Sequence, residues 1–185
     1  MDASKRTKFH PNEIKGLAKK GYELIQDKFN FNGNVIVTAL FIPDVGLAVG
    51  SKPRGTGMAD ELFMRSHKVS GKYDSVGSWF ERYWELVDGR DITDSCSDVL
   101  PEDLLHAEDL VIIKGADEYL KKEKIRDWGE KRFPKGTHMV SYGRYNSKPG
   151  SNSVGPKEPC GGTEKTQLSM PCKNIAHNLG IDWST

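Results

Sequence analysis

The chain has 185 residues, 36% of them hydrophobic and 29% charged, and its formal net charge at pH 7 is +1. This length predicts one domain with its own core, and the near-neutral charge excludes a protein that attracts nucleic acid through a global basic field. No apolar run is long enough for a transmembrane helix, and the polar N-terminal residues predict no secretory signal peptide. We therefore expect no membrane partner.

The N-terminal part predicts a helix followed by a β-hairpin. Across residues 11–29, apolar side chains recur at helical spacing, and Pro11 suits the first turn. Residues 34–50 contain two β-rich apolar runs that flank a turn at Pro43 and Asp44. The first run is almost continuously apolar, which indicates a strand covered on both faces.

The middle of the chain predicts loops and helices. Residues 51–75 are expected to form a long loop. Residues 77–87 predict a short amphipathic helix whose aromatic side chains either pack in the core or stack on a base. Residues 101–123 are expected to form a largely buried helix that begins at a proline and that Gly115 ends or kinks. Residues 117–132 are highly charged and have helical tendency.

The C-terminal part predicts one strand, one loop and one helix. Residues 138–145 are expected to form a strand, and residues 146–170 a loop rich in Pro, Gly, Ser and Asn. Residues 172–179 predict a short helix closed by Gly180. The order helix, hairpin, helix, strand, loop, helix indicates an α/β fold in which helices cover a mixed sheet.

Two short motifs carry the candidate chemistry: His106-Ala107-Glu108 in an apolar segment, and the proline–cysteine steps at Cys160 and Cys172. A carboxylate in an apolar helix costs free energy unless something pairs with it. A Zn²⁺ ion could take a neutral imidazole and two thiolates and keep a fourth position for water. A carboxylate that does not bind the metal could then move the protons. The three cysteines are too few, and odd in number, for a disulfide framework.

The His-Ala-Glu run followed by Pro-Cys resembles the signature of the cytidine-deaminase-like superfamily, which uses His-x-Glu and a later Pro-Cys-x-x-Cys. The resemblance covers about residues 12–181 and implies one deaminase-like domain over residues 1–185, with a three-layer fold. It implies that His106, Cys160 and Cys172 bind Zn²⁺ and that Glu108 is the proton shuttle. Within the superfamily, the His-Ala-Glu-Asp run and the closing Leu-Gly-Ile are most similar to toxin-type deaminases.

The chain departs from that pattern after Cys160. Thr163 stands where the superfamily has its second cysteine, and Cys172 follows Cys160 only after eleven intervening residues. We interpret residues 161–171 as an insertion between two ligands, because added loop length costs little free energy. Both cysteines follow a proline, and Cys172 begins the predicted helix, where a thiolate is favoured.

Other interpretations of these residues stay open at this point. His106 could be a satisfied core histidine, and Glu108 could be a surface residue of its helix. Cys160 and Cys172 could form a disulfide in a secreted protein. Cys96, in a polar segment, could replace one of the zinc ligands.

Candidate substrate contacts are Ser51 and Lys52, in the loop expected after the hairpin, and Tyr142, in the strand before the cysteine loop. A plain solvated loop and alternating exposure along the strand explain these three residues equally well. Ala107 and Pro159, inside the two motifs, are also candidates.

The resemblance implies hydrolytic deamination of a nucleobase, cytosine in preference to adenine, with a nucleic acid or nucleotide as substrate. A toxin effector domain would have an immunity protein as partner and would act in the reducing cytoplasm after secreted delivery. The alternatives are a deaminase of free nucleosides or nucleotides, and a non-catalytic binding module stapled by zinc or by a disulfide.

Overall fold

The structure is a computed structural model. The described residues are 8–29, 35–51, 106–124, 132–144, 153–158 and 172–185. The predicted helix over residues 77–87 and most of the predicted loop over residues 51–75 lie outside them. Cys96 and Cys160 also lie outside them.

The first helix and the hairpin confirm the expectations. Helix α1 spans Pro11–Phe29. Strand β1 spans Val35–Ile42 and strand β2 spans Gly46–Ser51, and the two pair antiparallel. All residues of β1 except Ile36 are buried, as expected for a strand covered on both faces. Ser51, placed in a loop by the sequence, is instead the last residue of β2.

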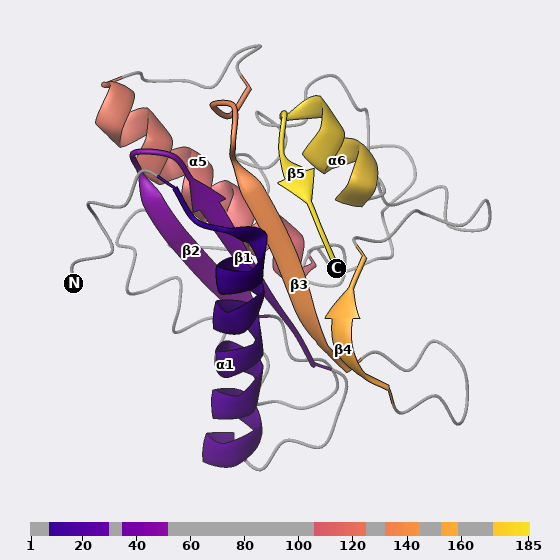
Figure 1. The fold of residues 1–185 in the computed structure, drawn as a ribbon. Helices are drawn as coiled ribbons and strands as arrows, with labels where there is room; N and C mark the ends of the chain where they lie inside the picture. Colours follow the sequence, from indigo (N-terminus) through magenta and orange to yellow (C-terminus); the bar gives the residue numbers. More distant parts are fainter. Residues whose placement is uncertain (1–7, 30–34, 52–105, 125–131, 145–152, 159–171) are drawn as a thin grey trace, which may run out of the picture.

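The sheet is mixed, as predicted (Figure 1). Strand β3 spans His138–Arg144, strand β4 spans Val154–Lys157 and strand β5 spans Asp182–Trp183. Strand β1 is antiparallel to both β2 and β3, and β3 pairs antiparallel with β4 and parallel with β5. The strand order is β2-β1-β3-β4, with β5 also on β3.

Strand β4 corrects the prediction of an uninterrupted loop over residues 146–170. Its four residues, Val-Gly-Pro-Lys, contain one apolar residue with β propensity and no alternation of apolar and polar residues. Their strand conformation comes from hydrogen bonds to the edge of β3, which the local sequence does not encode. Strand β5 was likewise not predicted, because two residues are too few to form a pattern.

Helix α5, which spans Ala107–Glu123, differs from the predicted helix at its start and in its middle. His106 is the N-cap, with extended backbone angles (φ −94°, ψ 173°), so it precedes the helix that was expected to contain it. The helix continues through Gly115 without ending there. It ends at Glu123, and the C-cap Lys124 has a left-handed φ of 56°. Most of the charged stretch beyond it, residues 125–131, lies outside the described residues.

The last helix, α6, spans Cys172–Asn178 and confirms the predicted short helix. Gly180 has a φ of 73°. Its N–H donates to the His177 carbonyl, and the Ile181 N–H donates to the Ala176 carbonyl. This pair of bonds is the Schellman motif, in which glycine relieves the strain of the left-handed position.

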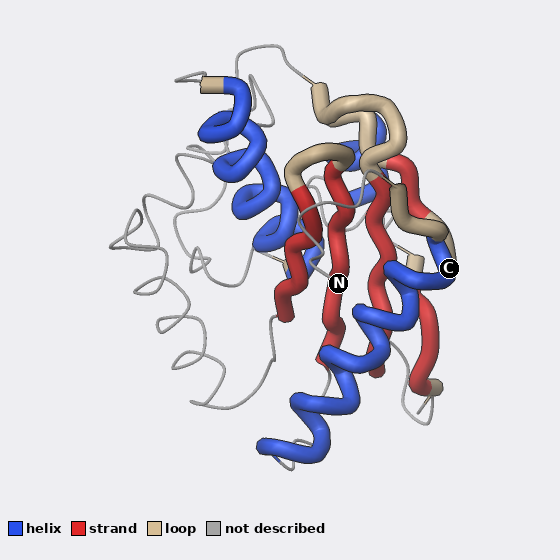
Figure 2. The backbone as a smooth tube through the Cα atoms, turned by 60° about the vertical axis from the view of Figure 1, so that its left-hand side comes forward, coloured by secondary structure: helices blue, strands red, loops and turns tan. Residues whose placement is uncertain are grey.

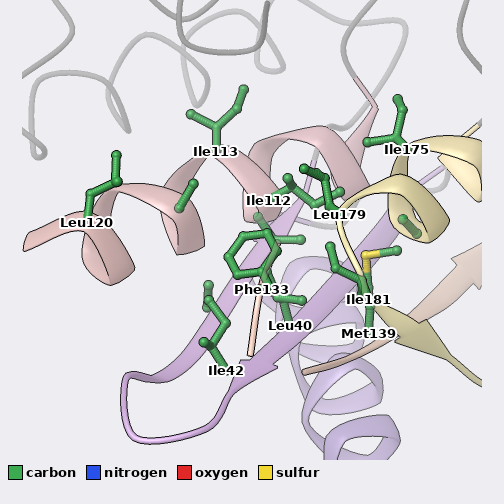
Figure 3. Close-up of a cluster of buried hydrophobic side chains, with 14 residues drawn as sticks. Leu40, Ile42, Ile112, Ile113, Leu120, Phe133, Met139, Ile175, Leu179 and Ile181 are labelled. Carbon is green, nitrogen blue, oxygen red and sulfur yellow. The ribbon is translucent and has the colours of Figure 1, made fainter. Parts of the chain in front are cut away.

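Helices cover both faces of the sheet, which gives three layers (Figure 2). On one face α1 packs Ile14 and Ala18 against β1 and β3. On the other face α5 and α6 share a larger cluster with both strands, including Leu40, Ile112 and Leu179 (Figure 3). The expected three layers are therefore present. None of the helices in the described part of the chain is both long enough and apolar enough to cross a lipid bilayer.

Candidate functional site

Three side chains of the predicted constellation come together on the sheet face that α5 and α6 cover. One potential ligand atom from each of His106, Glu108 and Cys172 lies within 4.8 Å of the other two. His106 and Cys172 are 66 residues apart in the sequence, yet His106 Nδ1 lies 3.2 Å from Cys172 Sγ. The His-Ala-Glu motif and Cys172 therefore meet in space.

The first turn of α5 positions two members of this group. The backbone N–H of His106 donates to Asp109 Oδ2 at 2.6 Å, which ties the N-cap residue to the helix it precedes. Glu108 follows in the first turn and is only 6% exposed, so the interpretation of Glu108 as a surface residue is wrong. A carboxylate at this end of a helix is favoured by the partial positive charge of the helix dipole.

Cys172, the first residue of α6, supplies the third member. It is buried. Cys160, its partner in the alternative of a disulfide, lies outside the described residues, so the structure does not test that alternative. The buried sulfur lies at hydrogen-bond distance from an imidazole nitrogen, which makes a polar contact between the two residues. The burial of these polar atoms is compensated by their mutual contact or by a bound cation.

Glu108 also has partners in the sheet. The Ser141 hydroxyl donates to Glu108 Oε1 at 2.8 Å. Ser141 Oγ lies 2.8 Å from Thr38 Oγ1, and the two residues are register partners in β3 and β1. Since Ser141 uses its proton toward Glu108, Thr38 is the donor between the hydroxyls. A directed chain of hydrogen bonds thus runs from Thr38 through Ser141 to Glu108.

The donor set suits zinc. Imidazole nitrogen and thiolate sulfur are the ligands that zinc prefers, at about 2.0–2.1 Å and 2.3 Å from the metal. Two such ligands at tetrahedral angles are about 3.5 Å apart, close to the 3.2 Å between His106 Nδ1 and Cys172 Sγ. The two atoms would have to move apart by about 0.3 Å to hold the ion.

The predicted substrate contacts fall in different places. Tyr142 lies on the opposite face of the sheet from this group, where its ring meets that of Tyr22 of α1 at 5.8 Å in an edge arrangement. Ser51 pairs in register with Val37, which also faces α1, so Ser51 lies on that same opposite face. Its Oγ is buried and has no hydrogen-bond partner within the described residues.

The remaining candidates divide between the helix and the undescribed segments. Ala107 is buried at the start of α5, between the two motif side chains in sequence. Lys52, Pro159 and Cys160 lie outside the described residues. The third predicted zinc ligand is therefore not among the residues whose geometry is known.

The sequence analysis missed Thr38 and Ser141. Both are essentially inaccessible to solvent, at 0% and 1% exposure. A signal was available, because each is a hydroxyl residue inside a strand whose neighbours are apolar, and buried hydroxyls need partners. Their common partner, Glu108, could not be named without the register of β1 and β3.

Comparison with known proteins adds no identification. No protein family, no curated protein and no solved structure was found to match the chain.

Proposed function

We propose that this chain is a zinc-dependent hydrolase that deaminates a nucleobase, cytosine in preference to adenine, in a nucleic acid. One observation carries the proposal: His106 Nδ1 lies 3.2 Å from Cys172 Sγ, with the buried carboxylate of Glu108 in the same group. The group combines two preferred zinc ligands with a group that can transfer protons. The resemblance to cytidine-deaminase-like proteins assigns these roles to the same three residues.

In this proposal His106, Cys160 and Cys172 hold the metal. The described residues on both sides of the cysteine loop are compatible with a contribution from Cys160. Lys173 Nζ lies 2.6 Å from Glu158 Oε2. This ion pair joins two residues that lie close to either end of the undescribed segment 159–171. Cys160 is only two residues beyond Glu158, and two residues span at most about 7 Å.

Zinc, when bound, supplies a water molecule whose pKa is lowered toward neutrality. Glu108 would accept a proton from the attacking water and deliver it to the ring nitrogen of the base. It would then help to protonate the amino group that leaves as ammonia, so that one C–N bond breaks and one C–O bond forms. Burial of Glu108 keeps bulk water from competing for these protons.

The choice of a polymeric substrate rests on the resemblance to toxin-type deaminases. The same resemblance adds two further parts to the proposal: the domain is delivered into the cytoplasm of a target cell, and a dedicated immunity protein is its partner. The near-neutral net charge implies that contacts close to the site, and not a global field, would hold the strand.

Metal analysis and an ammonia-release assay on the same sample test the proposal. We expect about one zinc per chain in protein purified without added metal. We also expect ammonia from at least one of three polymers, single-stranded DNA, double-stranded DNA or RNA, and we compare these with free cytidine. Zinc at one equivalent without ammonia from any cytosine or adenine substrate would instead indicate a closed structural site and a binding module. Ammonia from cytidine alone would identify a nucleoside deaminase.

A further inference from the structure

We propose that Ser141 and Thr38 are positioning residues that hold one oxygen of Glu108 and thereby aim the other at the reacting atoms. The inference rests on the proposed function and concerns two residues of the sheet that neither motif contains. Its test also distinguishes two roles of Glu108, because zinc content should depend on Ser141 only if Glu108 binds the metal.

The first step of the argument is the geometry of the chain of hydrogen bonds. Ser141 Oγ donates to Glu108 Oε1 at 2.8 Å, and Thr38 Oγ1 donates to Ser141 at 2.8 Å. Successive donors polarise one another, and hydrogen bonds to a charged acceptor are stronger than neutral ones. With Oε1 held in this way, rotation of the carboxylate is restricted, which favours one direction for its second oxygen.

The second step is that these hydrogen bonds lie in the buried centre of the sheet. Thr38 and Ser141 lie side by side in the central strands of the sheet, and both are excluded from solvent. Glu108 comes from the helix that covers the same strands. A flexible glutamate is thus attached to the sheet as well as to its own helix, which reduces its rotameric freedom.

The third step is that packing alone does not explain the arrangement. Leu40 and Ile42 of β1, which point to the same face as Thr38, are apolar and belong to the core cluster. A valine in place of Thr38 would fit the same space without any need for a partner. The hydroxyl pair is therefore best explained by what it does to Glu108.

Substitutions that remove a hydroxyl but keep the shape test the proposal. We expect Ser141→Ala to lower kcat about 10- to 100-fold, because a misaimed catalytic group costs that much. KM on a cytosine-containing single-stranded oligonucleotide, or on cytidine, should stay near the wild-type value, and so should the zinc content. Thr38→Val should lower kcat in the same direction but less, because it acts through Ser141.

The matched control is Thr38→Ser, which keeps the hydroxyl and removes the methyl group. It should lose less kcat than Thr38→Val, whereas a role in packing predicts the opposite order. The proposal is overturned if Ser141→Ala keeps wild-type kcat, or if Thr38→Ser is the more damaging change at that position. Loss of zinc from Ser141→Ala would also overturn it, because Ser141 would then support a metal ligand.

A measurement without turnover separates this inference from the proposed function. In protein carrying ¹³C-labelled glutamate, the carboxylate resonance that disappears in Glu108→Gln belongs to Glu108. At fixed pH we expect that resonance to shift in Ser141→Ala and Thr38→Val, and less in Thr38→Ser. If the wild type releases no ammonia from any substrate, the proposed function fails while this shift still decides on positioning. An unchanged resonance in Ser141→Ala would mean that the hydrogen bond is absent in solution.

Discussion

If Glu108 is the proposed proton shuttle, replacement of one of its carboxylate oxygens by an NH2 group should separate catalysis from folding. Glu108→Gln should keep the fold and the zinc, because glutamine is nearly isosteric and its carbonyl can still accept from Ser141. It cannot take a proton from water, so ammonia release should fall by at least about 10²–10⁴-fold. The measurement is ammonia release together with zinc analysis of the same sample.

The control for this variant lies in the same helix. Glu118 is exposed and pairs with Lys121 one turn along α5, so Glu118→Gln should leave both activity and zinc content near wild type. Turnover by Glu108→Gln at the wild-type rate would mean that Glu108 is not the shuttle. Loss of zinc from Glu108→Gln would mean that Glu108 binds the metal.

Cys172 and Cys96 should differ in whether the protein needs them to bind zinc. Cys172→Ser should remove the zinc, because Cys172 Sγ lies beside His106 Nδ1 and serine is a poor substitute for a thiolate ligand. Cys96→Ser should keep it, because Cys96 lies in a polar segment of the sequence outside both motifs. Elemental analysis of the two purified variants measures the difference. The reverse result would show that the ligand assignment is wrong even if zinc is present.

At the scale of the elements, two helical glycines should respond oppositely to alanine. Alanine gains about 1 kcal/mol over glycine inside a helix. Gly16 of α1 has open space where a Cβ would stand, so Gly16→Ala should stabilise the protein by up to about that amount. At Gly115 of α5 a Cβ would lie 2.7 Å from Ile42 Cδ1 and 2.8 Å from Leu40 Cδ2.

Overpacking of a dense core typically costs about 1–3 kcal/mol, so Gly115→Ala should be neutral to destabilising. The free energy of unfolding, measured with denaturant, should therefore be lower for Gly115→Ala than for Gly16→Ala. Equal stabilisation by both changes would show that α5 can move away from β1 without cost. The same close approach explains why Gly115 lies inside the helix and does not end it.

Where β3 meets β5, stability should depend on pH. Burial lowers the pKa of His138 below 6.5, partly offset by the nearby charge of Asp182, which raises it. The unfolded chain therefore binds this proton more readily than the folded chain does. The contribution of neutral His138 to the stability of the fold is fully present above about pH 6.5. It is lost as the pH falls through the pKa of His138 in the folded protein.

We expect the melting temperature to decrease between about pH 7 and pH 5.5, and His138→Gln to reduce the part of that decrease due to this group. His177→Gln, a change at an exposed histidine of α6, controls for the loss of a histidine as such. Identical pH profiles for wild type and His138→Gln would contradict the assignment. Thermal melts at a series of pH values measure all three proteins.

For the whole molecule, bound zinc should stabilise the fold, because His106 and Cys172 connect two helices that contact the same core cluster. A ligand at 100 times its dissociation constant adds about 2.7 kcal/mol. For a protein of this size, that corresponds to roughly 5–10 °C in melting temperature. Removal of the metal by a chelator should lower the melting temperature by about this much in the wild type and by much less in Cys172→Ser. Equal melting temperatures with and without chelator would argue against a metal that joins these helices.

Periodicity predicted the elements that have enough residues to show a pattern. Helix α1, the hairpin, β3 and α6 all begin and end within a few residues of the predicted ranges. The start of α5 was predicted too early, because the apolar residues before His106 continue the pattern without revealing a cap. Strand β4 was missed, because hydrogen bonds to β3 and not its own residues make it a strand.

By itself the sequence determined which residues could do chemistry, because His-Ala-Glu and the proline–cysteine steps are local arrangements of residue types. It also determined most of the helices and strands of the described residues, because their apolar periods are local. Only the tertiary structure decided that His106, Glu108 and Cys172 meet and that Tyr142 faces away from them. It alone joined Thr38, Ser141 and Glu108, since strand register and helix packing are set by long-range contacts that no local pattern records.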